Sequence, residues 1–553
     1  MPVTDSDGRD RTPGERADVC VVGSGPAGAL VARDLAEAGH TVVVLEAGPR
    51  FDRESRLERM ERAIRPAWGP DAVWDMGGDR DAYTSSGDRH YPLNQARVKG
   101  VGGSTLHWQG MVLRLHEDDF RRRSVDGVGV DWPISYGDLQ PFYAAAEEAM
   151  GVAGASDNPF APPREEPFPL PAFEPSYSDA LFAEACERLG VATHTVPNAR
   201  NSEPRHGRSA CVGYGTCDPV CPSGAKYSAD YTVAAAEEAG ARTIDRAPVQ
   251  RLVPSRDGST VEAAVYATPD GSEYRQPARQ FVVAAGGVET PRLLLLSADA
   301  DRGHPDGLAN GSGWVGRGFM DHLFVGVGGR LDEPTRQNHV GFLTSESHAF
   351  YDDPGRATSG TAGGIPASDA DLGPIKLEFL NYAGPSPVEL AMDAETFGDD
   401  LLEDLRGAYG THVAMGGLVG QLPRPENRVT LDDSRTDDHG NPVPDVQWSL
   451  DARTERTIQR AVDIQTRIMH ELGATVETTV TPEGTGPAYH QMGATRMHAD
   501  PSEGVVDERL RAHEVDNLSL VGASVFPTGG AMNPTLTIAA LALKCANHLA
   551  ADL

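Results

Sequence analysis

Three cysteines lie close together near the middle of the chain, in the spacing Cys211-x5-Cys217-x3-Cys221. Thiolates this close in sequence can converge on one soft metal centre. Pro222 follows Cys221 directly, an ending that iron–sulfur segments also use. Zinc stays open with His206 as a fourth ligand, although Cys-x2-Cys and His-x3-His spacings are absent. The remaining interpretations are another metal, a redox disulfide or plain buried thiols.

A second set of residues indicates nucleotide chemistry. Gly23-x-Gly25-x-x-Gly28 stands between an apolar strand-like run and a helical stretch, and Glu46 ends the next predicted strand. Glycines in this pattern permit a tight turn and a close approach of a pyrophosphate to the helix N-terminus. The acid accepts hydrogen bonds from ribose hydroxyls. The pattern therefore predicts a dinucleotide site but does not separate FAD from NAD.

Two later segments favour a flavin. Small residues in Gly100–Trp108 would let the chain pass close to a flat ring system. The segments 517–527 and 533–538 predict a strand, a turn and a helix that bring the C-terminal end to the same nucleotide.

In these motifs, the sequence resembles the glucose-methanol-choline (GMC) oxidoreductases. The resemblance rests on the N-terminal glycines, on Gly102-Gly103-Ser104-Thr105, and on motifs at 284–291, 315–322, 489–490 and 533–538. It spans nearly the whole chain in the family's order. It implies an enzyme that binds FAD and oxidises alcohols. The FAD contacts expected on this resemblance are Gly23, Gly25, Gly28, Glu46, Gly102, Gly103, Ser104, His107, Val249, Ala523, Asn533 and Thr535.

The resemblance also implies a catalytic pair. His490 falls where the family carries its catalytic base, and a neutral imidazole can take the hydroxyl proton as hydride leaves the carbon. Asn533 falls where the family carries histidine or asparagine as the second catalytic group. An amide there can donate to the substrate oxygen without competing for the proton.

His107 raises a separate question. Some members of the family attach FAD through a histidine four residues after the second glycine of the Gly-Gly pair, which is the spacing from Gly103 to His107. The alternative is a histidine that only packs near the flavin.

The cysteine segment resembles that of the FAD-dependent glucose, gluconate and fructose dehydrogenase catalytic subunits, a GMC subgroup. This implies a 3Fe–4S cluster held by Cys211, Cys217 and Cys221. Such a cluster would pass electrons singly to a cytochrome or quinone-linked acceptor, and a small companion subunit is expected. Two alternatives are an oxidase that uses oxygen and a non-catalytic flavin/iron–sulfur electron-transfer subunit.

The elements that must position these residues predict an α/β fold. We expect a Rossmann-like FAD-binding domain built from separated segments, with an inserted α+β substrate-binding domain. The expected boundaries are a flexible lead at 1–16, FAD-binding segments at 17–130, 201–325 and 481–553, a cap segment at 131–200 and the substrate domain at 326–480. Substrate contacts are expected in 330–480, with Asn381, Tyr382, His412 and Gln421 as polar candidates only.

The net charge of the chain excludes further classes of function. The 553 residues carry a net charge of −32, with 81 acidic residues against 49 basic ones, of which only Lys99, Lys226, Lys376 and Lys544 are lysines. A surface this acidic repels nucleic acid and anionic lipid. We interpret it as a halophile-type surface, and we expect assays of the protein to need molar salt. No apolar run of membrane-spanning length is present, so a cytoplasmic protein is expected, or one held at a membrane by a partner subunit.

Overall fold

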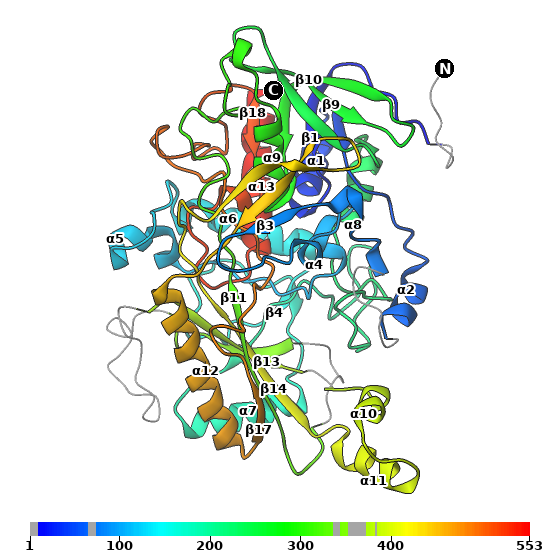
Figure 1. Ribbon diagram of the computed structural model, residues 1–553, viewed down its shortest axis with the longest axis vertical. Coiled ribbons are helices and arrows are strands. Elements are labelled where there is room, and N and C mark those ends of the chain that lie inside the picture. The colour runs from blue at the N-terminus through cyan, green and yellow to red at the C-terminus, as the bar shows by residue number, and fades with distance from the viewer. Residues whose placement is uncertain (1–8, 65–72, 336–342, 352–371, 382–383) are drawn as a thin grey trace.

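The computed structural model describes residues 9–64, 73–335, 343–351, 372–381 and 384–553 (Figure 1). Residues 9–16, within the expected lead, lie against the protein. The buried Arg11 guanidinium donates to the Asp245 carbonyl at 2.8 Å, and the Tyr266 hydroxyl donates to the Arg11 carbonyl at 2.7 Å. None of the helices in the described ranges is long and apolar enough to cross a bilayer.

The first sheet carries the parallel strands from which the nucleotide turns emerge. Its seven strands run in the order β7-β2-β1-β10-β9-β8, and β18 also pairs with β10. Strands β2, β7, β1, β18 and the C-terminal part of β10 are parallel, whereas β8 and β9 pair antiparallel. Apolar runs such as 19–22 and 42–45 are buried, as parallel strands require. The bounds are β1 Ala17–Val22, β2 Val42–Leu45, β7 Arg242–Ile244, β8 Val249–Pro254, β9 Val261–Ala267, β10 Glu273–Val283 and β18 Leu518–Leu520.

Helices pack beside this sheet and bring both chain ends together. Helix α1 begins at Pro26, whose fixed φ suits the first helical position. It packs against α13 and α8, and α13 also packs against α6, while α9 contacts β8. The bounds are α1 Pro26–Glu37, α6 Tyr136–Met150, α8 Asp230–Glu238, α9 Gly286–Leu296 and α13 Thr535–Asp552.

A second sheet lies below the first along the long axis of the molecule (Figure 1). It is antiparallel, in the order β17-β11-β14-β13-β12-β6. Helix α12 packs on it through its apolar stripe, which includes Ile458, Ala461, Ile464 and Ile468. The bounds are α7 Tyr177–Arg188, β6 His194–Thr195, β11 Leu323–Arg330, β12 Leu343–Ser347, β13 Ile375–Leu380, β14 His412–Val419, α12 Ala452–Leu472 and β17 Thr475–Thr479.

Shorter elements complete the described chain. Strands β15, β16 and β3 form a three-stranded sheet, and β4 pairs with β5. The bounds are α2 Arg56–Ala63, β3 Thr84–Ser86, α4 Leu93–Ala96, α5 Arg122–Asp126, β4 Ala153–Gly154, β5 Leu170–Pro171, α10 Pro387–Asp393, α11 Asp399–Ala408, β15 Arg428–Thr436 and β16 Pro442–Gln447. The 3-10 helices are η1 Asp79–Asp81, η2 Gly103–Leu106, η3 Glu117–Arg121, η4 Ala300–Arg302 and η5 Ala523–Val525.

The two-part α/β architecture expected from the sequence is confirmed, and the structure adds detail to its boundaries. Within 131–200, helix α6 packs on α13 beside the nucleotide sheet, whereas only α7 and β6 join the second sheet. Within 326–480, strands β15 and β16 contact α9 of the nucleotide half. The chain therefore crosses between the two halves more often than its composition suggests.

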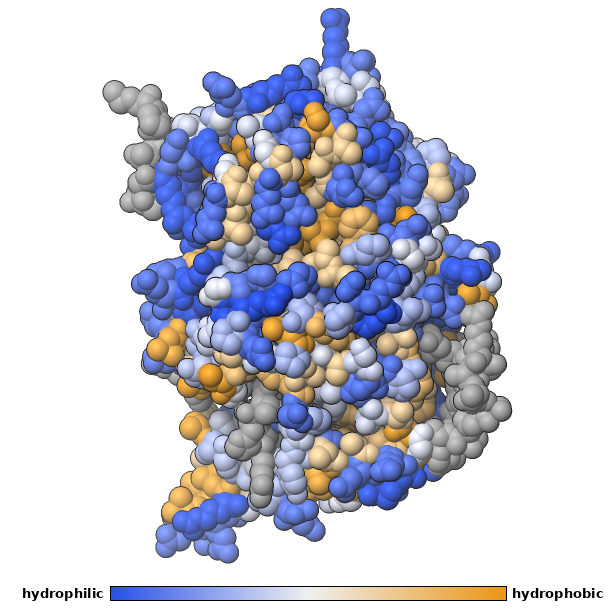
Figure 2. Space-filling view, turned by 180° about the vertical axis from the view of Figure 1, so that it is seen from behind, coloured by the Kyte–Doolittle hydropathy of each residue, from blue (hydrophilic) through white to orange (hydrophobic). Residues whose placement is uncertain are grey.

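The face in Figure 2 is hydrophilic over much of its area, with apolar residues near the middle and on part of a lobe at the lower left. This lobe is the α10–α11 pair, where Met392 and Phe397 are 73% and 86% exposed.

Lysines contribute little to the exterior. Lys226, Lys376 and Lys544 are buried, and Lys99 forms ion pairs with Asp81 and Glu289.

Candidate active site

A cavity of about 770 Å³ opens where the two halves of the protein meet. One wall is formed by turns at the carboxyl ends of parallel strands, the edge at which open α/β sheets bind their ligands. The opposite wall comes from the second sheet. The first wall includes Gly23, Glu46, Ala284 and Gly522, and the second includes Phe324, Glu378, Leu418 and Val480.

The three N-terminal glycines differ in what surrounds them. Gly23 has φ +97°, and a Cβ there would lie 2.5 Å from the Ala284 carbonyl oxygen. A Cβ on Gly28 would lie 2.0 Å from the Gly23 oxygen, so only glycine lets the helix pack so close to the turn. Gly25, which precedes α1, has open space where its Cβ would be. The amides at the start of α1 have no side-chain cap, which leaves them available to an anion.

Glu46 is fixed at the end of β2. Its carboxylate accepts hydrogen bonds from the Ser24 amide at 2.9 Å, the Ser24 hydroxyl at 2.6 Å and the Gly48 amide at 2.9 Å. Burial raises its pKa, against the effect of these hydrogen bonds. The side chain lines the cavity beside the glycine turn, as a ribose-binding acid must.

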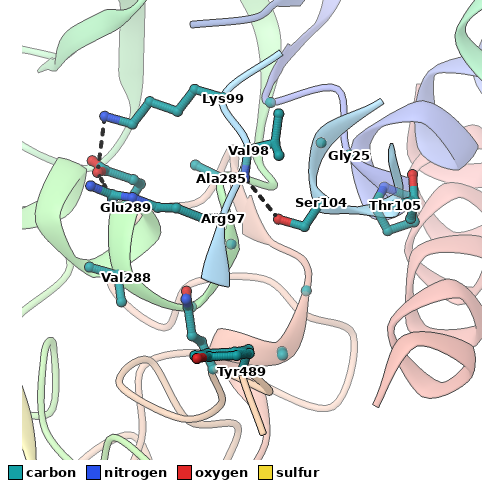
Figure 3. Close-up of a pocket in the computed structure, with 18 of the residues that line it drawn as sticks. Gly25, Arg97, Val98, Lys99, Ser104, Thr105, Ala285, Val288, Glu289 and Tyr489 are labelled. Atoms are coloured by element: carbon teal, nitrogen blue, oxygen red, sulfur yellow. Dashed lines mark hydrogen bonds and ion pairs between the residues drawn. The ribbon is translucent and has the colours of Figure 1, made fainter. Parts of the chain in front are cut away.

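The second glycine cluster packs directly on the first. Gly103 has φ +56°, and a Cβ there would lie 2.9 Å from the Gly25 Cα. Gly102, at φ +105°, lies behind it against Asp230. Ser104 accepts a hydrogen bond from the Val98 amide at 3.2 Å (Figure 3). Two segments about 80 residues apart in sequence therefore build one continuous floor for a ligand.

The sequence did not indicate a cluster of charged side chains that lies in the same cavity as the two glycine clusters. Glu289 of α9 forms ion pairs with Arg97 and with Lys99, the latter at 3.3 Å (Figure 3). Although burial opposes ionisation, Lys99, Arg292 and Arg97 hold the pKa of Glu289 well below its usual range. All three of Arg97, Lys99 and Glu289 line the cavity.

His490 and Asn533 meet in the same cavity, although 43 residues separate them. The His490 amide donates to Asp321 Oδ1 at 2.7 Å, which fixes the backbone that carries the imidazole. Asn533 lies just before α13, whose first residue is Thr535. Its Nδ2 lies 3.5 Å from His490 Nε2.

A chain of hydrogen bonds defines the His490 tautomer. His322 Nε2 lies 3.2 Å from the Gly529 carbonyl oxygen, which can only accept, so this nitrogen carries the proton. His322 Nδ1 is then the acceptor for His490 Nδ1, at 2.9 Å. His490 Nε2 is left with a free lone pair facing Asn533. Burial, the neighbouring His322 and the Lys376 charge hold the pKa of His490 well below 6.5.

Comparisons with known proteins agree with this geometry. The GMC oxidoreductase family matches residues 84–324 and 423–542, and a FAD binding domain matches residues 16–62. The chain belongs to the GMC oxidoreductases. The fructose dehydrogenase large subunit of Gluconobacter japonicus is 34% identical, over 97% of this chain and 98% of that protein. The 2-methyl-1,2-propanediol dehydrogenase of Mycolicibacterium austroafricanum is 30% identical, over 97% and 96%.

Among solved structures, pyridoxine 4-oxidase from "Mesorbium loti" shares the fold, with a TM-score of 0.65 and 20% identity over 96% of this chain and 99% of that one. This GMC oxidoreductase is thus an FAD-dependent enzyme that acts on CH–OH groups. The glycine turn, the uncapped α1 amides and Glu46 fit the pyrophosphate and ribose of that cofactor. Ser104, Val249, Ala523 and Thr535 also line the cavity, whereas Gly28 and Gly102 support its wall from behind.

His107 follows η2 and lines the same cavity. Its Nε2 is buried without a hydrogen-bond partner. Burial and the Lys226 charge lower the pKa of His107 to about 4. The imidazole is therefore neutral at pH 7, with a nitrogen lone pair available.

The three clustered cysteines lie in a loop behind the cavity wall. None of the six cysteines forms a disulfide. The Gly213 amide donates to Cys211 Sγ at 3.4 Å, and the Lys226 amide donates to Cys221 Sγ at 3.5 Å. Such N–H···S contacts support thiolates that hold an iron–sulfur cluster.

Electrostatics and spacing bear on what this loop could hold. Against the effect of burial, the Lys226 amide, Ser223 and the Lys226 and Arg56 charges lower the pKa of Cys221, whereas burial raises that of Cys211. A single zinc ion with Zn–S bonds of about 2.3 Å would need the sulfurs about 4 Å apart. The three cysteine sulfurs are not that close, since the only three-ligand group found within 4.8 Å among the described residues is His194, Glu346 and His348.

The polar candidates of the second domain that are described lie outside the cavity. Gln421 binds the Asp321 amide and the Trp448 indole, and Asn381 accepts from Ser178. Neither they nor His412 line the cavity, and Tyr382 lies outside the described residues. The second sheet instead contributes Phe324, Glu378 and Leu418. Glu378 shows a weak sequence signal, an acid within the apolar run 375–380.

Proposed function

We propose that this chain is a dehydrogenase that oxidises an alcohol group of a sugar, a polyol or a related compound. The observation that carries the proposal is the facing pair of His490 Nε2 and Asn533 Nδ2 in the cavity next to the nucleotide turn. When bound, FAD would supply the hydride-accepting chemistry for the oxidation of the alcohol carbon. His490 and Asn533 are the residues that we assign to the substrate oxygen.

The two side chains divide the work on the hydroxyl group. His490 Nε2, unprotonated and neutral, accepts the hydroxyl proton as the carbon–oxygen double bond forms. Asn533 Nδ2 donates to the same oxygen and holds it within reach of the base. An amide cannot take the proton itself, so the pair does not compete for it. Phe324 and Leu418 line the same cavity, and we assign them as its apolar wall on the substrate side.

We also propose that Cys211, Cys217 and Cys221 hold a 3Fe–4S cluster, which carries electrons one at a time to an external cytochrome or quinone-linked acceptor. The support is the position of the loop. The buried Lys226 ammonium donates to the carbonyls of Leu106, Trp108 and Cys217, which ties the cysteine loop to the cavity wall. One relative is a large subunit by name, and a small companion subunit is part of this proposal.

The third part of the proposal concerns the flavin linkage. His107 Nε2 is neutral, buried and without a partner at the cavity wall, so we assign it as the attachment point of FAD. Precipitation with acid should leave the yellow colour with the protein. Colour released wholly into the supernatant would contradict the linkage and leave the catalytic proposal untouched.

The alcohol chemistry is tested by an anaerobic screen of sugars, polyols and hydroxy acids that follows flavin absorbance. We expect at least one compound to bleach the flavin of the wild-type protein. In His490→Ala, the reduction rate should fall about 100-fold to 10,000-fold with FAD still bound. His513→Ala is the matched control, since His513 lies outside the cavity and contacts the His498 carbonyl.

Two outcomes would contradict the leading assignment. Undiminished turnover in His490→Ala would show that His490 is not the base. Hydrogen peroxide formed in air as fast as a dye is reduced would favour the oxidase. For the cluster, we expect about three iron atoms per chain in protein prepared without oxygen, and their loss in Cys217→Ser. A protein that contains about one flavin but no iron per chain would contradict the proposed cluster.

A further inference from the structure

A lysine from the second sheet contacts the catalytic asparagine. Lys376 lies on β13, and its Nζ donates to Asn533 Oδ1 at 2.6 Å. The side chain is fully buried, in a chain with only four lysines. This contact joins the substrate half of the protein to the start of α13 in the nucleotide half.

The direction of this hydrogen bond defines the orientation of the Asn533 side-chain amide. An ammonium group can only donate, so the Asn533 atom that faces it must be the carbonyl oxygen. The amide nitrogen then points to the other side, where His490 Nε2 lies at 3.5 Å. Without the lysine, the amide could rotate by 180° and present an acceptor to the substrate oxygen instead of a donor.

We infer that Lys376 is a positioning residue, which locks Asn533 in the orientation that donates to the substrate oxygen. The inference deepens the proposed function and rests on it. Lys376 does not touch the substrate in this assignment. It acts through Asn533, and it places a positive charge near the base.

The lysine is itself held by two buried carboxylates. Lys376 Nζ lies 2.7 Å from Glu378 Oε1 and 3.4 Å from Glu346 Oε2. Burial opposes the charge, but these two acids raise the pKa of Lys376 above its ordinary value. Glu346 in turn pairs with His348 Nε2 at 3.1 Å. The ammonium is therefore charged and fixed at any pH at which the enzyme works.

The same neighbourhood could be interpreted as a cation site, because His194, Glu346 and His348 place one ligand atom each within 4.8 Å of the others. The contacts favour the lysine as the resident cation. Glu346 already accepts from His348 and faces the Lys376 ammonium. A divalent ion there would place a second positive charge beside that ammonium, which is unfavourable in a buried site.

A double-mutant cycle tests the inference. Lys376→Met keeps the aliphatic stem and removes the donor, and we expect the anaerobic flavin reduction rate to fall about 10-fold to 100-fold. If Lys376 acts through Asn533, the same change in an Asn533→Ala background should lower the rate less than about 2-fold. A full loss in both backgrounds would overturn the inference.

Controls separate positioning from folding. Lys544→Met removes another buried lysine, which donates to the Glu508 carbonyl, and should leave the reduction rate unchanged. If Lys376→Met folds poorly because two acids lose their partner, Lys376→Met with Glu346→Gln removes one of those charges, and the same cycle is run on it. A stoichiometric divalent metal bound at His194 and His348 in the wild-type protein would also overturn the inference.

A second readout does not use activity. The C2 proton of His490, assigned with the His490→Ala variant, reports the imidazole pKa by nuclear magnetic resonance. The charged and titratable groups around it are His322, Asp321 and Lys376. Loss of the ammonium should raise the His490 pKa, whereas Lys544→Met should not. An unchanged pKa in Lys376→Met would contradict the charge that we assign. A wild-type flavin that no alcohol reduces would instead refute the proposed function.

Discussion

His490 and Asn533 are each held by a group with only one hydrogen-bond direction. The Gly529 carbonyl can only accept, and through His322 it leaves the lone pair of His490 at Nε2. The Lys376 ammonium can only donate, and it leaves the Asn533 amide nitrogen facing that lone pair. An acceptor and a donor that meet in this way suit a hydroxyl group, which needs both.

Neutral buried histidines have a consequence for stability at acid pH. Burial lowers the pKa of His107 and His322 to about 4 and that of His348 to about 3, against 6.5 in the unfolded chain. Below pH 6.5 the unfolded chain therefore binds more protons than the folded protein at these sites, and stability falls as the pH approaches 4. Asp321, whose pKa burial raises to about 7, works in the opposite direction, as do Glu46 and Asp218, whose pKa values burial also raises. His490, whose pKa burial holds well below 6.5, adds to the effect of the three histidines.

We expect the urea midpoint of the protein to be clearly lower at pH 5 than at pH 7.5, before most carboxylates titrate. Fluorescence of the tryptophans during urea unfolding measures it. Because His348 carries the largest depression of these three, His348→Gln should reduce the difference between the two pH values. Equal midpoints at pH 5 and pH 7.5 would show that these histidines are not buried neutral.

At the scale of elements, the turn between β1 and α1 depends on the absence of one side chain. A Cβ on Gly28 would lie 2.0 Å from the Gly23 oxygen, and the backbone cannot yield without moving the helix away from the turn. Gly28→Ala should therefore cost about 1–3 kcal/mol in free energy of unfolding and release most of the FAD. Flavin content per chain and urea unfolding measure both.

Gly137→Ala is the matched control for this change. Gly137 lies in the first turn of α6, and the nearest atom to its Cβ would be Ser135 Oγ at 3.6 Å, an ordinary contact. That variant should keep its flavin and gain a few tenths of a kcal/mol in stability from reduced chain entropy. Normal flavin content in Gly28→Ala would show that the helix start is not constrained as described.

The same elements explain what could be predicted from the sequence. The glycine turn and Glu46 are readable because one short βαβ unit contains them. The contacts of Lys376 with Glu346 and Asn533 are not readable in this way, because they join β13 to β12 and to the start of α13, which meet only in the folded chain. The lysine and the acid within the apolar run 375–380 were the available signals for this group. The packing of α6 on α13 is not readable from the sequence either, because almost 400 residues separate the two helices.

At the scale of the whole molecule, the net charge of −32 is not needed by any group in the cavity. Arginine supplies nearly all of the exposed positive charge, since three of the four lysines are buried and Lys99 is largely enclosed by its ion pairs. Repulsion among surface carboxylates should dominate stability in dilute buffer and weaken as salt shortens the Debye length.

We therefore expect the melting temperature to rise by several degrees between about 0.05 M and 2 M KCl, most steeply at the low end where screening sets in. Differential scanning fluorimetry measures this, with sucrose as a control for excluded-solute effects that are independent of charge. A melting temperature that does not change with KCl would contradict the interpretation of the acidic surface and leave the flavoenzyme assignment as it is.

The interior position of the lysines also decides how this enzyme can be handled. Reagents that attack amines, such as succinimidyl esters and glutaraldehyde, would find almost no side-chain target on the folded protein. The abundant exposed acids offer the opposite chemistry. Carbodiimide coupling of those carboxyls to an amine-coated electrode would attach the protein without touching Lys226, which contacts the cysteine loop, or Lys376, which contacts Asn533.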